Sequence, residues 1–404
     1  MNYKILHTAD WHLGRKFHDL DLAEYHLLFF NWLLDFIKDE EVNLLLTSGD
    51  AFDLANPSQE SQKLYYHFLS QLSSTSCAAI ITAGNHDSPG LIDAPSGILE
   101  TLKIHVVGAA PENKDELIFP LKNKSGEVFA AVAAVPFLRD RDVKRAVESE
   151  TYDSRIEAVR SGMENYFLEV KERMNVLFPN TLHIAMGHLF AANASPSDTE
   201  RDIQVGNQAL FPISSFENLF DYVALGHIHK AQSLGLAGKI RYSGSPLPMS
   251  FSEKNYSHQV VLVEINGASL SHKEIKIPRE FELIGIQSNL QKLKEEMSHL
   301  FNRIDTKTFF DITVEEDNYD PKVFSDLEVI IDDLQQNQFC KVLQRRVKFK
   351  NNSTNLVSPE QMGSADELSP EFIYSQMIST RDQKEKNQLM EIFFEIKQKV
   401  EEDL

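Results

Sequence analysis

Five short polar runs, each placed directly after an apolar stretch, carry the residue types in this chain that could do chemistry. They are Asp10-Trp11-His12, Gly49-Asp50-Ala51-Phe52-Asp53, Gly84-Asn85-His86-Asp87, Gly187-His188 and Gly226-His227-Ile228-His229. Together they supply carboxylates, imidazoles and one amide, which are ligands that can hold two divalent cations side by side. Two such cations clamp a phosphate and generate a hydroxide beside it, so the runs predict hydrolysis of a phosphoester.

A binuclear site needs a bridging carboxylate and several terminal ligands on each cation. Asp50 is the candidate bridge. The terminal ligands predicted for one cation are Asp10, His12 and His229, and those predicted for the other are Asn85, His188 and His227. Nitrogen and oxygen ligands without sulfur suit Mn²⁺, Fe²⁺ or Zn²⁺, whereas Mg²⁺ is less comfortable among so many imidazoles.

His86 adjoins the ligand Asn85, so its ring can face the substrate without binding a cation. It is the candidate general acid, which protonates the leaving oxygen. Asp53 is predicted to orient this imidazole and to hold it protonated. Asp87 is a weaker candidate for the same task.

Each run has a plainer interpretation when it is taken alone. Asp10-x-His12 is more often a turn, and Gly49–Asp53 could be a strand–helix junction with Asp53 as the helix cap. Gly187-His188 alone carries no signal, whereas Gly84–Asp87 and Gly226–His229 are more specific. The occurrence of all five in this order, each after an apolar run, favours the binuclear site.

Apolar runs alternate with amphipathic helical stretches over the first 280 residues, which indicates an α/β fold. The predicted strands are 4–8, 42–48, 78–83, 128–136, 181–186 and 222–225, followed by 240–243 and 259–265. Ligands bind outside the carboxyl ends of strands in open α/β sheets, so the five motifs are expected to converge on one site. A helix between the first two strands, read from Leu27 to Phe36, suits a buried helix better than a one-sided one.

The pattern of apolar and polar residues changes after Pro278, and a second, smaller α/β unit is predicted over residues 279–350. Its expected elements are strand 281–286, helix 290–301, strand 309–314, helix 327–334 and strand 342–349. Residues 351–368 are polar and predict a linker. Residues 369–404 predict two helices, and the apolar face of the second could dock on a partner or pack on its own domain.

Composition limits the function classes. The chain has 404 residues and a net charge of −20, which argues against a free-standing, high-affinity DNA binder. Its two cysteines, Cys77 and Cys340, lie far apart, so a reducing cytoplasm without disulfides is expected. No apolar run approaches the length of a membrane span, and the start lacks the pattern of a signal peptide.

The five motifs, in this order, resemble the calcineurin-like metallophosphoesterase superfamily. Four further segments are similar to the SbcD nuclease family within it: Thr8-Ala9-Asp10-Trp11-His12-Leu13-Gly14-Arg15, Pro136-Phe137-Leu138-Arg139-Asp140-Arg141-Asp142, Ser197-Asp198-Thr199-Glu200-Arg201 and the stretch from Tyr242 to Glu253. The resemblance covers most of residues 1–265 and is weaker beyond them.

This resemblance implies a metallophosphoesterase β-sandwich flanked by helices (1–278), a small α/β capping domain (279–350), and C-terminal helices (369–404) that dock on the coiled-coil base of an SbcC-type ATPase. It also implies a dimeric, Mn²⁺-dependent enzyme, a 3′–5′ exonuclease and hairpin endonuclease on double-stranded DNA ends, active in DNA repair, recombination and replication. The family's motif roles fall on Asp10, His12, Asp50, Asn85, His86, His188, His227 and His229.

Basic residues near the motifs are candidate contacts to the DNA backbone, since phosphate contacts position a duplex without reading its sequence. They are Arg15 and Lys16 behind the first motif, and Arg139, Arg141, Lys144 and Arg145 behind the strand that ends at Pro136. For the second group, a solvated helix start balanced by Asp140 and Asp142 is equally open.

Two rival functions remain open. A protein phosphatase or a cyclic-nucleotide phosphodiesterase could use the same metal site. Protein phosphatases of this superfamily carry Arg directly after the second aspartate of Gly-Asp-x-x-Asp and Glu in place of Asp87, but here Leu54 follows Asp53. The second rival is a scaffold that has lost its metals, and the intact ligands argue against it.

Overall fold

The structure, a computed structural model, describes residues 2–143, 152–201, 203, 210–235, 237–300, 303–351, 385–386, 389–390 and 392–393. Nearly all of the predicted linker and C-terminal helices therefore lies outside the described residues. The chain divides into two units, one of Met1–Glu315 with Pro321–Lys348 and the other of Glu316–Asp320 with Phe349–Leu404. All five motifs belong to the first unit, and the domain boundary expected at residue 278 stays a prediction.

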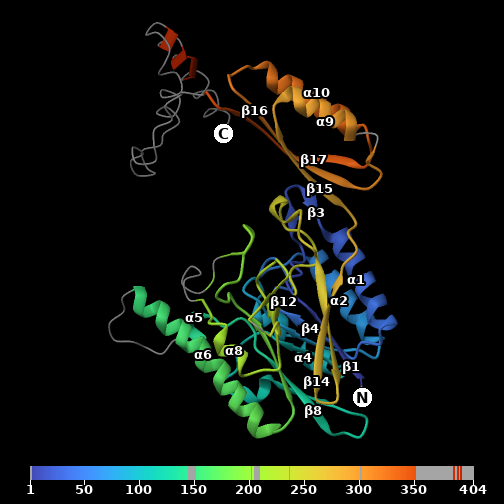
Figure 1. The fold of residues 1–404 in the computed structure, drawn as a ribbon, viewed down its shortest axis with the longest axis vertical. Coiled ribbons are helices and arrows are strands. Elements are labelled where there is room, and N and C mark those ends of the chain that lie inside the picture. Colours follow the sequence, from blue (N-terminus) through green and yellow to red (C-terminus); the bar gives the residue numbers. More distant parts are fainter. Residues whose placement is uncertain are drawn as a thin grey trace. The chain divides into compact units, whose positions relative to one another are not determined.

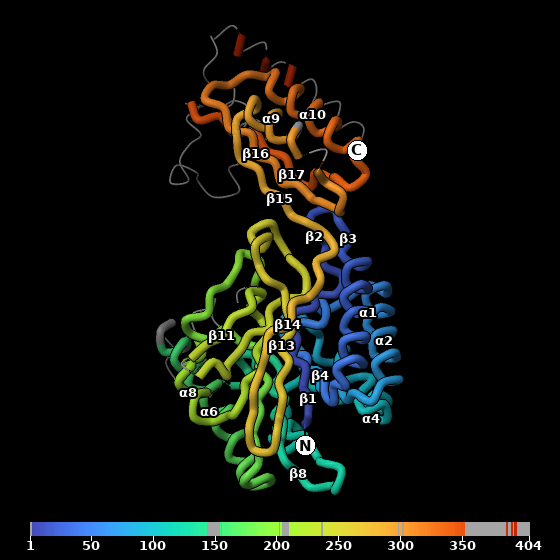
Figure 2. The backbone as a smooth tube through the Cα atoms, turned by 45° about the vertical axis from the view of Figure 1, so that its right-hand side comes forward, coloured from blue at the N-terminus to red at the C-terminus, as the bar shows by residue number. Residues whose placement is uncertain are grey.

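Two six-stranded sheets form the part of the first unit that carries the motifs. The strands of the first sheet, in spatial order, are β14 (Ser269–Lys276), β13 (Gln259–Asn266), β1 (Asn2–Thr8), β4 (Leu44–Ser48), β5 (Ala78–Thr82) and β6 (Ile104–Val107). From β1 to β6 the neighbours are parallel. The β13–β14 hairpin adds two antiparallel strands beside β1 (Figure 2).

The strands of the second sheet are β11 (Gln232–Leu234), β12 (Ile240–Tyr242), β10 (Tyr222–Gly226), β9 (Leu182–His188), β8 (Val128–Ala134) and β7 (Ile118–Lys122). β12, β10, β9 and β8 are parallel to one another, and β11 and β7 are antiparallel edge strands. A strand is thus present at every one of the eight places where the sequence predicts one up to residue 266.

The two sheets face each other across a common apolar core. Ile5, Leu46 and Ile80 of the first sheet pack with Val132 and Ile184 of the second. The outer face of the first sheet is covered by α1 (Ala23–Asp39) and α2 (Gln59–Ser73), and the second sheet packs on α6 (Tyr152–Leu177) (Figure 1). This is the predicted β-sandwich flanked by helices.

Helix α1 differs from its prediction as a buried helix. Phe29, Phe30 and Leu33 are buried against the sheet, whereas Leu27 and Leu28 are 39% and 37% exposed. The helix is therefore one-sided, because it lies on the outside of the sandwich and only one of its faces meets the sheet.

The three-stranded sheet after Pro278 has the order β15-β16-β17 and carries two helices. The elements are β15 (Glu282–Ser288), α9 (Leu290–Leu300), β16 (Thr308–Glu316), α10 (Lys322–Gln335) and β17 (Cys340–Phe349). They match the five elements predicted there within a few residues. In the second unit, Lys350 N donates to Glu316 O (2.9 Å), and the rings of Tyr319 and Phe349 pack edge-on with centroids 5.1 Å apart.

The composition predicts neither a membrane span nor a disulfide. No helix within the described ranges is long and apolar enough to span a bilayer. Cys77 and Cys340 are both buried and unpaired with each other, as their spacing predicts.

Candidate metal centre

Each motif begins at or just after the carboxyl end of a strand. β1, β4 and β5 lead into Asp10, Asp50 and Asn85, while β9 ends at His188 and β10 ends one residue before His227. Because β1, β4 and β5 are neighbours in one sheet and β9 and β10 are neighbours in the other, their ends lie at one edge of the sandwich. The motifs converge at this edge, as the order of the strands predicts.

The backbone at this edge adopts conformations that residues other than glycine rarely take. The φ angles of Asp10, His12 and Asp50 are 55°, 48° and 51°. Gly49 has φ of 86°, and a Cβ there would come within 2.1 Å of the His188 ring. Hydrogen bonds from Asp10 N to Gly49 O (3.1 Å) and from His12 N to Asp50 O (3.0 Å) join the two loops. Such strain persists only where the surroundings enforce it, and it is concentrated at functional sites.

Asp50 lies at the centre of the cluster. Its Oδ2 is 3.6 Å from His12 Nε2 and 3.3 Å from His188 Nε2, and its Oδ1 accepts a hydrogen bond from His86 N (2.9 Å). Burial alone would raise the pKa of Asp50, but the charge of His188 and its hydrogen bond outweigh burial and hold that pKa well below its usual range. The buried carboxylate is therefore ionised and faces imidazoles on two sides, as a bridging ligand must.

The candidate ligands fall into two groups that meet at Asp50. We call them the first position (Asp10, His12 and His229) and the second position (Asn85, His188 and His227).

At the first position, His12 Nε2 and His229 Nε2 face each other at 3.1 Å. The ligand atoms of Asp10, His12 and Asp50 all lie within 4.8 Å of one another. Asp10 Oδ1 accepts a hydrogen bond from His227 N (2.8 Å). Two facing imidazole nitrogens beside two carboxylates can surround one cation.

At the second position, His188 Nε2 lies 2.9 Å from Asn85 Oδ1. His188 Nδ1 donates to the carbonyl oxygen of Ser48 (2.9 Å), so Nε2 is the nitrogen left to bind a cation. The ring of His227 packs edge-on to that of His188, with centroids 5.5 Å apart. These contacts bring the three residues together as the sequence predicts.

Three buried polar atoms of the cluster, Asp10 Oδ2, His12 Nδ1 and His227 Nε2, have no hydrogen-bond partner among the described residues. Leaving a buried oxygen such as Asp10 Oδ2 unsatisfied costs about 1–3 kcal/mol, and a bound cation would remove that cost. The donor set contains imidazole nitrogens, carboxylates and an amide oxygen, with no sulfur. The residues therefore fit two divalent cations, although such a donor set does not select one metal.

His86 is held beside the first position. Its Nδ1 donates to the carbonyl oxygen of Asp53 (2.7 Å), and its ring centroid lies 4.6 Å from that of His12. The Asp53 carboxylate is 4.0 Å from His86 Nδ1 but 3.3 Å from His12 Nδ1 and 3.2 Å from Arg15 Nη1. Thus Asp53 orients His86 through its main chain and turns its carboxylate to His12, which differs from the predicted role.

The protonation of His86 differs from the expectation too. Burial lowers its pKa, and the charge of Arg201 adds to this effect, while Asp50 and the carbonyl of Asp53 oppose it. The ring is therefore not held protonated by the free site. A phosphate near the ring would favour the protonated form, since a nearby negative charge stabilises the imidazolium.

Asp87 is placed to hold loops rather than to orient His86. Its carboxylate accepts hydrogen bonds from Gly84 N (2.8 Å), Phe52 N (2.9 Å) and Ala51 N (3.1 Å). These bonds join the loop after β4 to the loop after β5. The weaker candidacy of Asp87 for orienting the general acid is therefore not supported by its contacts.

A group of polar residues behind His229 was not assigned a role from the sequence. Thr199 Oγ1 lies 2.7 Å from His229 Nδ1, and Glu253 Oε1 lies 3.3 Å from the same nitrogen. Glu200 Oε1 accepts a hydrogen bond from His229 N (2.9 Å). Thr199, Glu200 and Glu253 stand inside segments whose only signal in the sequence was their likeness to the SbcD family.

The candidate DNA contacts differ in placement. Arg15 is tied to Asp53 and so lies at the site, and Lys16 begins the short strand β2 (Lys16–Phe17), paired with β3 (Leu20–Asp21). Phe137 packs edge-on to His188, which brings the segment leading to Arg139 near the second position. Arg141 is strongly exposed and lies 3.7 Å from Asp142, and Lys144 and Arg145 lie outside the described residues.

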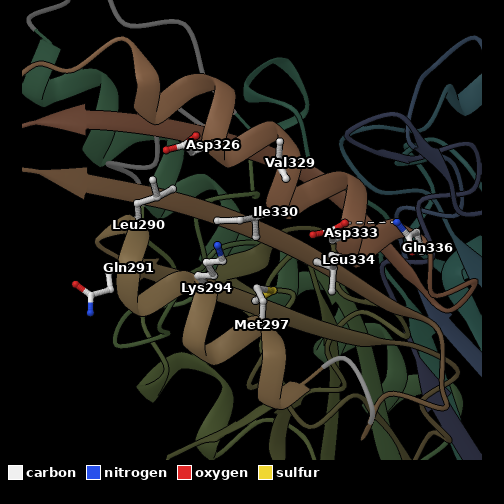
Figure 3. Close-up of a pocket in the computed structure, with 10 residues that line it drawn as sticks. All are labelled: Leu290, Gln291, Lys294, Met297, Asp326, Val329, Ile330, Asp333, Leu334 and Gln336. Carbon is white, nitrogen blue, oxygen red and sulfur yellow. Dashed lines mark hydrogen bonds between the residues drawn. The ribbon is translucent and has the colours of Figure 1, made fainter.

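A cavity of about 720 Å³ lies between α9 and α10 (Figure 3). Its lining is mostly apolar, with Leu290, Met297 and Ile330 among the side chains that point into it. No histidine is among the described residues that line it, so this cavity offers no imidazole to a metal ion.

The family model of the calcineurin-like phosphoesterases matches residues 3–231, which include all five motifs. The chain belongs to this family. The phosphoesterase fold and the presence of a metal-dependent hydrolytic site, both expected from the sequence, are thereby confirmed.

Curated relatives place the phosphoesterase more narrowly. The SbcD subunit of the SbcCD nuclease of Escherichia coli K12 is 29% identical over 399 residues, which cover 96% of each chain. The protein of the same name from Rhodobacter capsulatus is 34% identical over 70% of this chain and 71% of its own, and that from Bacillus subtilis is 33% identical over 65% and 66%. The chain is thus a nuclease of the SbcD family, as its motifs predict.

Solved structures add little to this assignment. A dimetal phosphatase from Danio rerio is 8% identical, with a TM-score of 0.39, over 68% of this chain and 99% of its own.

Proposed function

We propose that this phosphoesterase is the Mn²⁺-dependent DNA nuclease subunit of a complex with an SbcC-type ATPase, and that it hydrolyses phosphodiester bonds at double-stranded DNA ends and hairpins. The observation that carries the proposal is the meeting of two ligand groups on Asp50, with His86 beside them. A homodimer, a cytoplasmic location and a part in DNA repair, recombination and replication belong to the same proposal, as the resemblance to the SbcD family implies. The relatives' name, a subunit of the SbcCD nuclease, supports the partner.

The first and second positions would hold two divalent cations, which when bound would supply a nucleophile at neutral pH and stabilise the charge on the reacting phosphate. The chain's own residues then account for the remaining needs of the reaction. His86 is fixed at Nδ1 by the Asp53 carbonyl, which leaves Nε2 as the atom that can carry a proton to the leaving oxygen. Arg15, Lys16, Arg139 and Arg141 are proposed to contact the DNA backbone.

The donor set supports Mn²⁺ over Mg²⁺, because four imidazoles surround the two positions and Mg²⁺ prefers oxygen ligands. The net charge of −20 supports the need for a partner, since a chain of this charge attracts a polyanion poorly by itself. Leu54, which follows Asp53 where protein phosphatases of the superfamily carry Arg, is half-exposed and supplies no positive charge for a phosphoprotein.

The test compares substrates. The full-length chain with Mn²⁺ is incubated with linear duplex DNA, with a phosphoserine peptide and with a cyclic nucleotide. Cleavage of the DNA is expected to be preferred, and Asp50→Ala is expected to abolish both metal binding and cleavage. A preference for either small substrate would reject the nuclease proposal, and absence of bound metal in the wild-type chain would favour a scaffold.

A further inference from the structure

The two positions differ in the groups that contact their ligands from the side away from the cations. At the first position, His12 has a carboxylate on that side. Its Nε2 faces the metal cluster, while its Nδ1 lies 3.3 Å from the carboxylate of Asp53. The same carboxylate is fixed from its other side by Arg15, 3.2 Å away. A carboxylate behind a ligating histidine fixes the orientation of the ring and makes it a stronger ligand.

His229 has a second carboxylate behind it. Glu253 is fully buried and lies with Oε1 3.3 Å from His229 Nδ1. Its other oxygen, Oε2, accepts a hydrogen bond from Met249 N (2.7 Å), and Ser197 Oγ donates to Oε1 (2.9 Å). Thr199 Oγ1 lies 2.7 Å from His229 Nδ1 and 2.5 Å from Glu253 Oε1, so it joins the two. These fixed contacts hold His229 with Nε2 toward His12.

The second position has weaker support. Behind His188 stands the main-chain carbonyl of Ser48, a neutral acceptor. No ion pair joins His227 to a carboxylate within the described ranges, and its main-chain nitrogen donates to Asp10, which belongs to the first position.

The first position also carries more negative charge than the second. Both positions share Asp50, but the first adds the carboxylate of Asp10 where the second adds only the neutral amide of Asn85. Asp53 and Glu253 then add two negative charges next to the first position. The carboxylate that lies 3.9 Å from His188 Nδ1 at the second position is that of Asp10, which is already counted at the first. Attraction between unlike charges in a buried site is strong, so this difference favours a cation at the first position.

We propose that the two positions bind cations with unequal affinity, and that Asp53 and Glu253 make the first position the one that fills first. This inference rests on the proposed two-metal nuclease. Glu253 and Asp53 are positioning residues for His229 and His12. The second position then sets the metal concentration at which hydrolysis begins, because both cations are needed for it.

The test titrates Mn²⁺ into the chelator-treated, full-length chain and follows binding by calorimetry and by the electron paramagnetic resonance signal of free Mn²⁺. The wild-type chain is expected to bind two equivalents in two distinct steps. Glu253→Gln is expected to weaken the tighter step by about 10–100-fold, the usual effect of losing the group behind a metal ligand. The weaker step should change less than the tighter step, because the ligands of the second position are intact, although the shared Asp50 couples the two steps.

A matched control variant distinguishes the effect of orienting His229 from the effect of joining the two loops that carry Thr199 and Glu253. Asp198 joins the same two segments by accepting hydrogen bonds from Ser250 and Ser252, and it makes none to His229 among the described residues. Asp198→Asn should therefore leave both steps within about twofold of wild type. If Glu253→Gln loses cooperative thermal unfolding, Asp53→Asn, which acts on His12 at a less buried side chain, replaces it with the same expected result.

Two outcomes would overturn the inference: binding of two equivalents with one affinity in the wild-type chain, or a variant that weakens the second step as much as the first. Failure of the wild-type chain to bind Mn²⁺ at all is a different result. It would reject the proposed function itself.

Discussion

His86 and Asp50 are neighbours in the site with different tasks. The main-chain nitrogen of His86 donates to Asp50, but the His86 ring turns away to the carbonyl of Asp53. The ring can therefore act on the substrate without holding a cation, and its loss should separate metal binding from cleavage.

His86→Ala should keep two bound Mn²⁺ and lose most of its DNA cleavage, by about 10²–10⁴-fold, the usual contribution of a general acid. Rates on duplex DNA and metal content, measured on the same sample, check this. His86→Asn is the matched control, because its amide nitrogen can take the place of Nδ1 and donate to the Asp53 carbonyl but cannot transfer a proton. Near wild-type cleavage by either variant would show that another group protonates the leaving oxygen.

The metal ligands could be predicted from the sequence because each follows an apolar strand and the carboxyl ends of neighbouring strands must meet. The groups that contact these ligands from behind could not be predicted from the sequence. Glu253 and Thr199 lie 24 and 30 residues from His229, in a short 3₁₀ helix (Phe251–Glu253) and in a loop, where no periodicity shows what they face. The motif Asp50–Asp53 also could not show whether the carboxylate or the carbonyl of Asp53 faces His86, since that depends on the turn of the loop.

At the scale of elements, the two sheets approach each other closely at Gly226, the last residue of β10. A Cβ there would lie 1.8 Å from the carbonyl oxygen of Ser48 and 2.9 Å from His188 Nδ1. The close approach lets Ser48 O accept the hydrogen bond that orients His188. A methyl group at this point must push β10 away from β4.

Gly226→Ala should therefore destabilise the chain by about 1–3 kcal/mol, the range for overpacking of a core, and should weaken metal binding. Urea unfolding and Mn²⁺ titration measure the two effects. Gly97→Ala in α4 (Ser96–Thr101) is the control, because a Cβ there meets nothing within 4 Å and alanine favours a helix. Equal stability of the two variants would contradict the close approach of the sheets.

Helix α1 is fixed to the first motif by His26, whose Nε2 donates to the carbonyl oxygen of Trp11 (2.7 Å). His26 is fully buried, and burial lowers its pKa to about 4 from an ordinary 6.5. Above pH 6.5 the ring is neutral in both the folded and unfolded chain. Between pH 6.5 and about 4 the unfolded chain binds the extra proton, so stability falls as pH falls, by about 1.4 kcal/mol per pH unit from this group.

His26→Gln keeps a donor for the Trp11 carbonyl but cannot take up the proton. Its stability should therefore fall less steeply than that of the wild type between pH 6.5 and 4, and the two slopes should agree above pH 6.5. Urea unfolding at constant ionic strength across this range checks the prediction. Parallel curves throughout would mean that His26 titrates normally in the folded chain.

Helix α1 also shows what the pattern of apolar residues in a sequence does not predict. Leu27, Leu28 and Trp32 in one stretch indicated burial all round, yet two of the three are exposed beyond a third of their surface. The number of apolar residues does not reveal whether a second layer covers a helix, because that depends on the layers of the whole fold.

At the scale of the whole molecule, the net charge of −20 and the buried metal cluster lead to opposite expectations for a DNA enzyme. We expect the site to hydrolyse a small phosphodiester by itself, since its candidate ligands and their supporting groups lie between Asp10 and Glu253. Holding a long polyanion is a separate task, and the chain's net negative charge does not favour it.

Removal of residues 369–404 should separate these two tasks. The truncated and full-length chains should hydrolyse a small phosphodiester with Mn²⁺ at equal rates, because no candidate ligand lies in the removed segment. Only the full-length chain should bind the ATPase partner and cleave duplex DNA faster when the partner and ATP are added, since the apolar face predicted for the last helix, with Leu389 and Phe393, would dock on it. Co-purification and the two rates measure this. Equal stimulation of both chains would place the docking surface elsewhere, and loss of the small-substrate activity would show that the segment supports the fold instead.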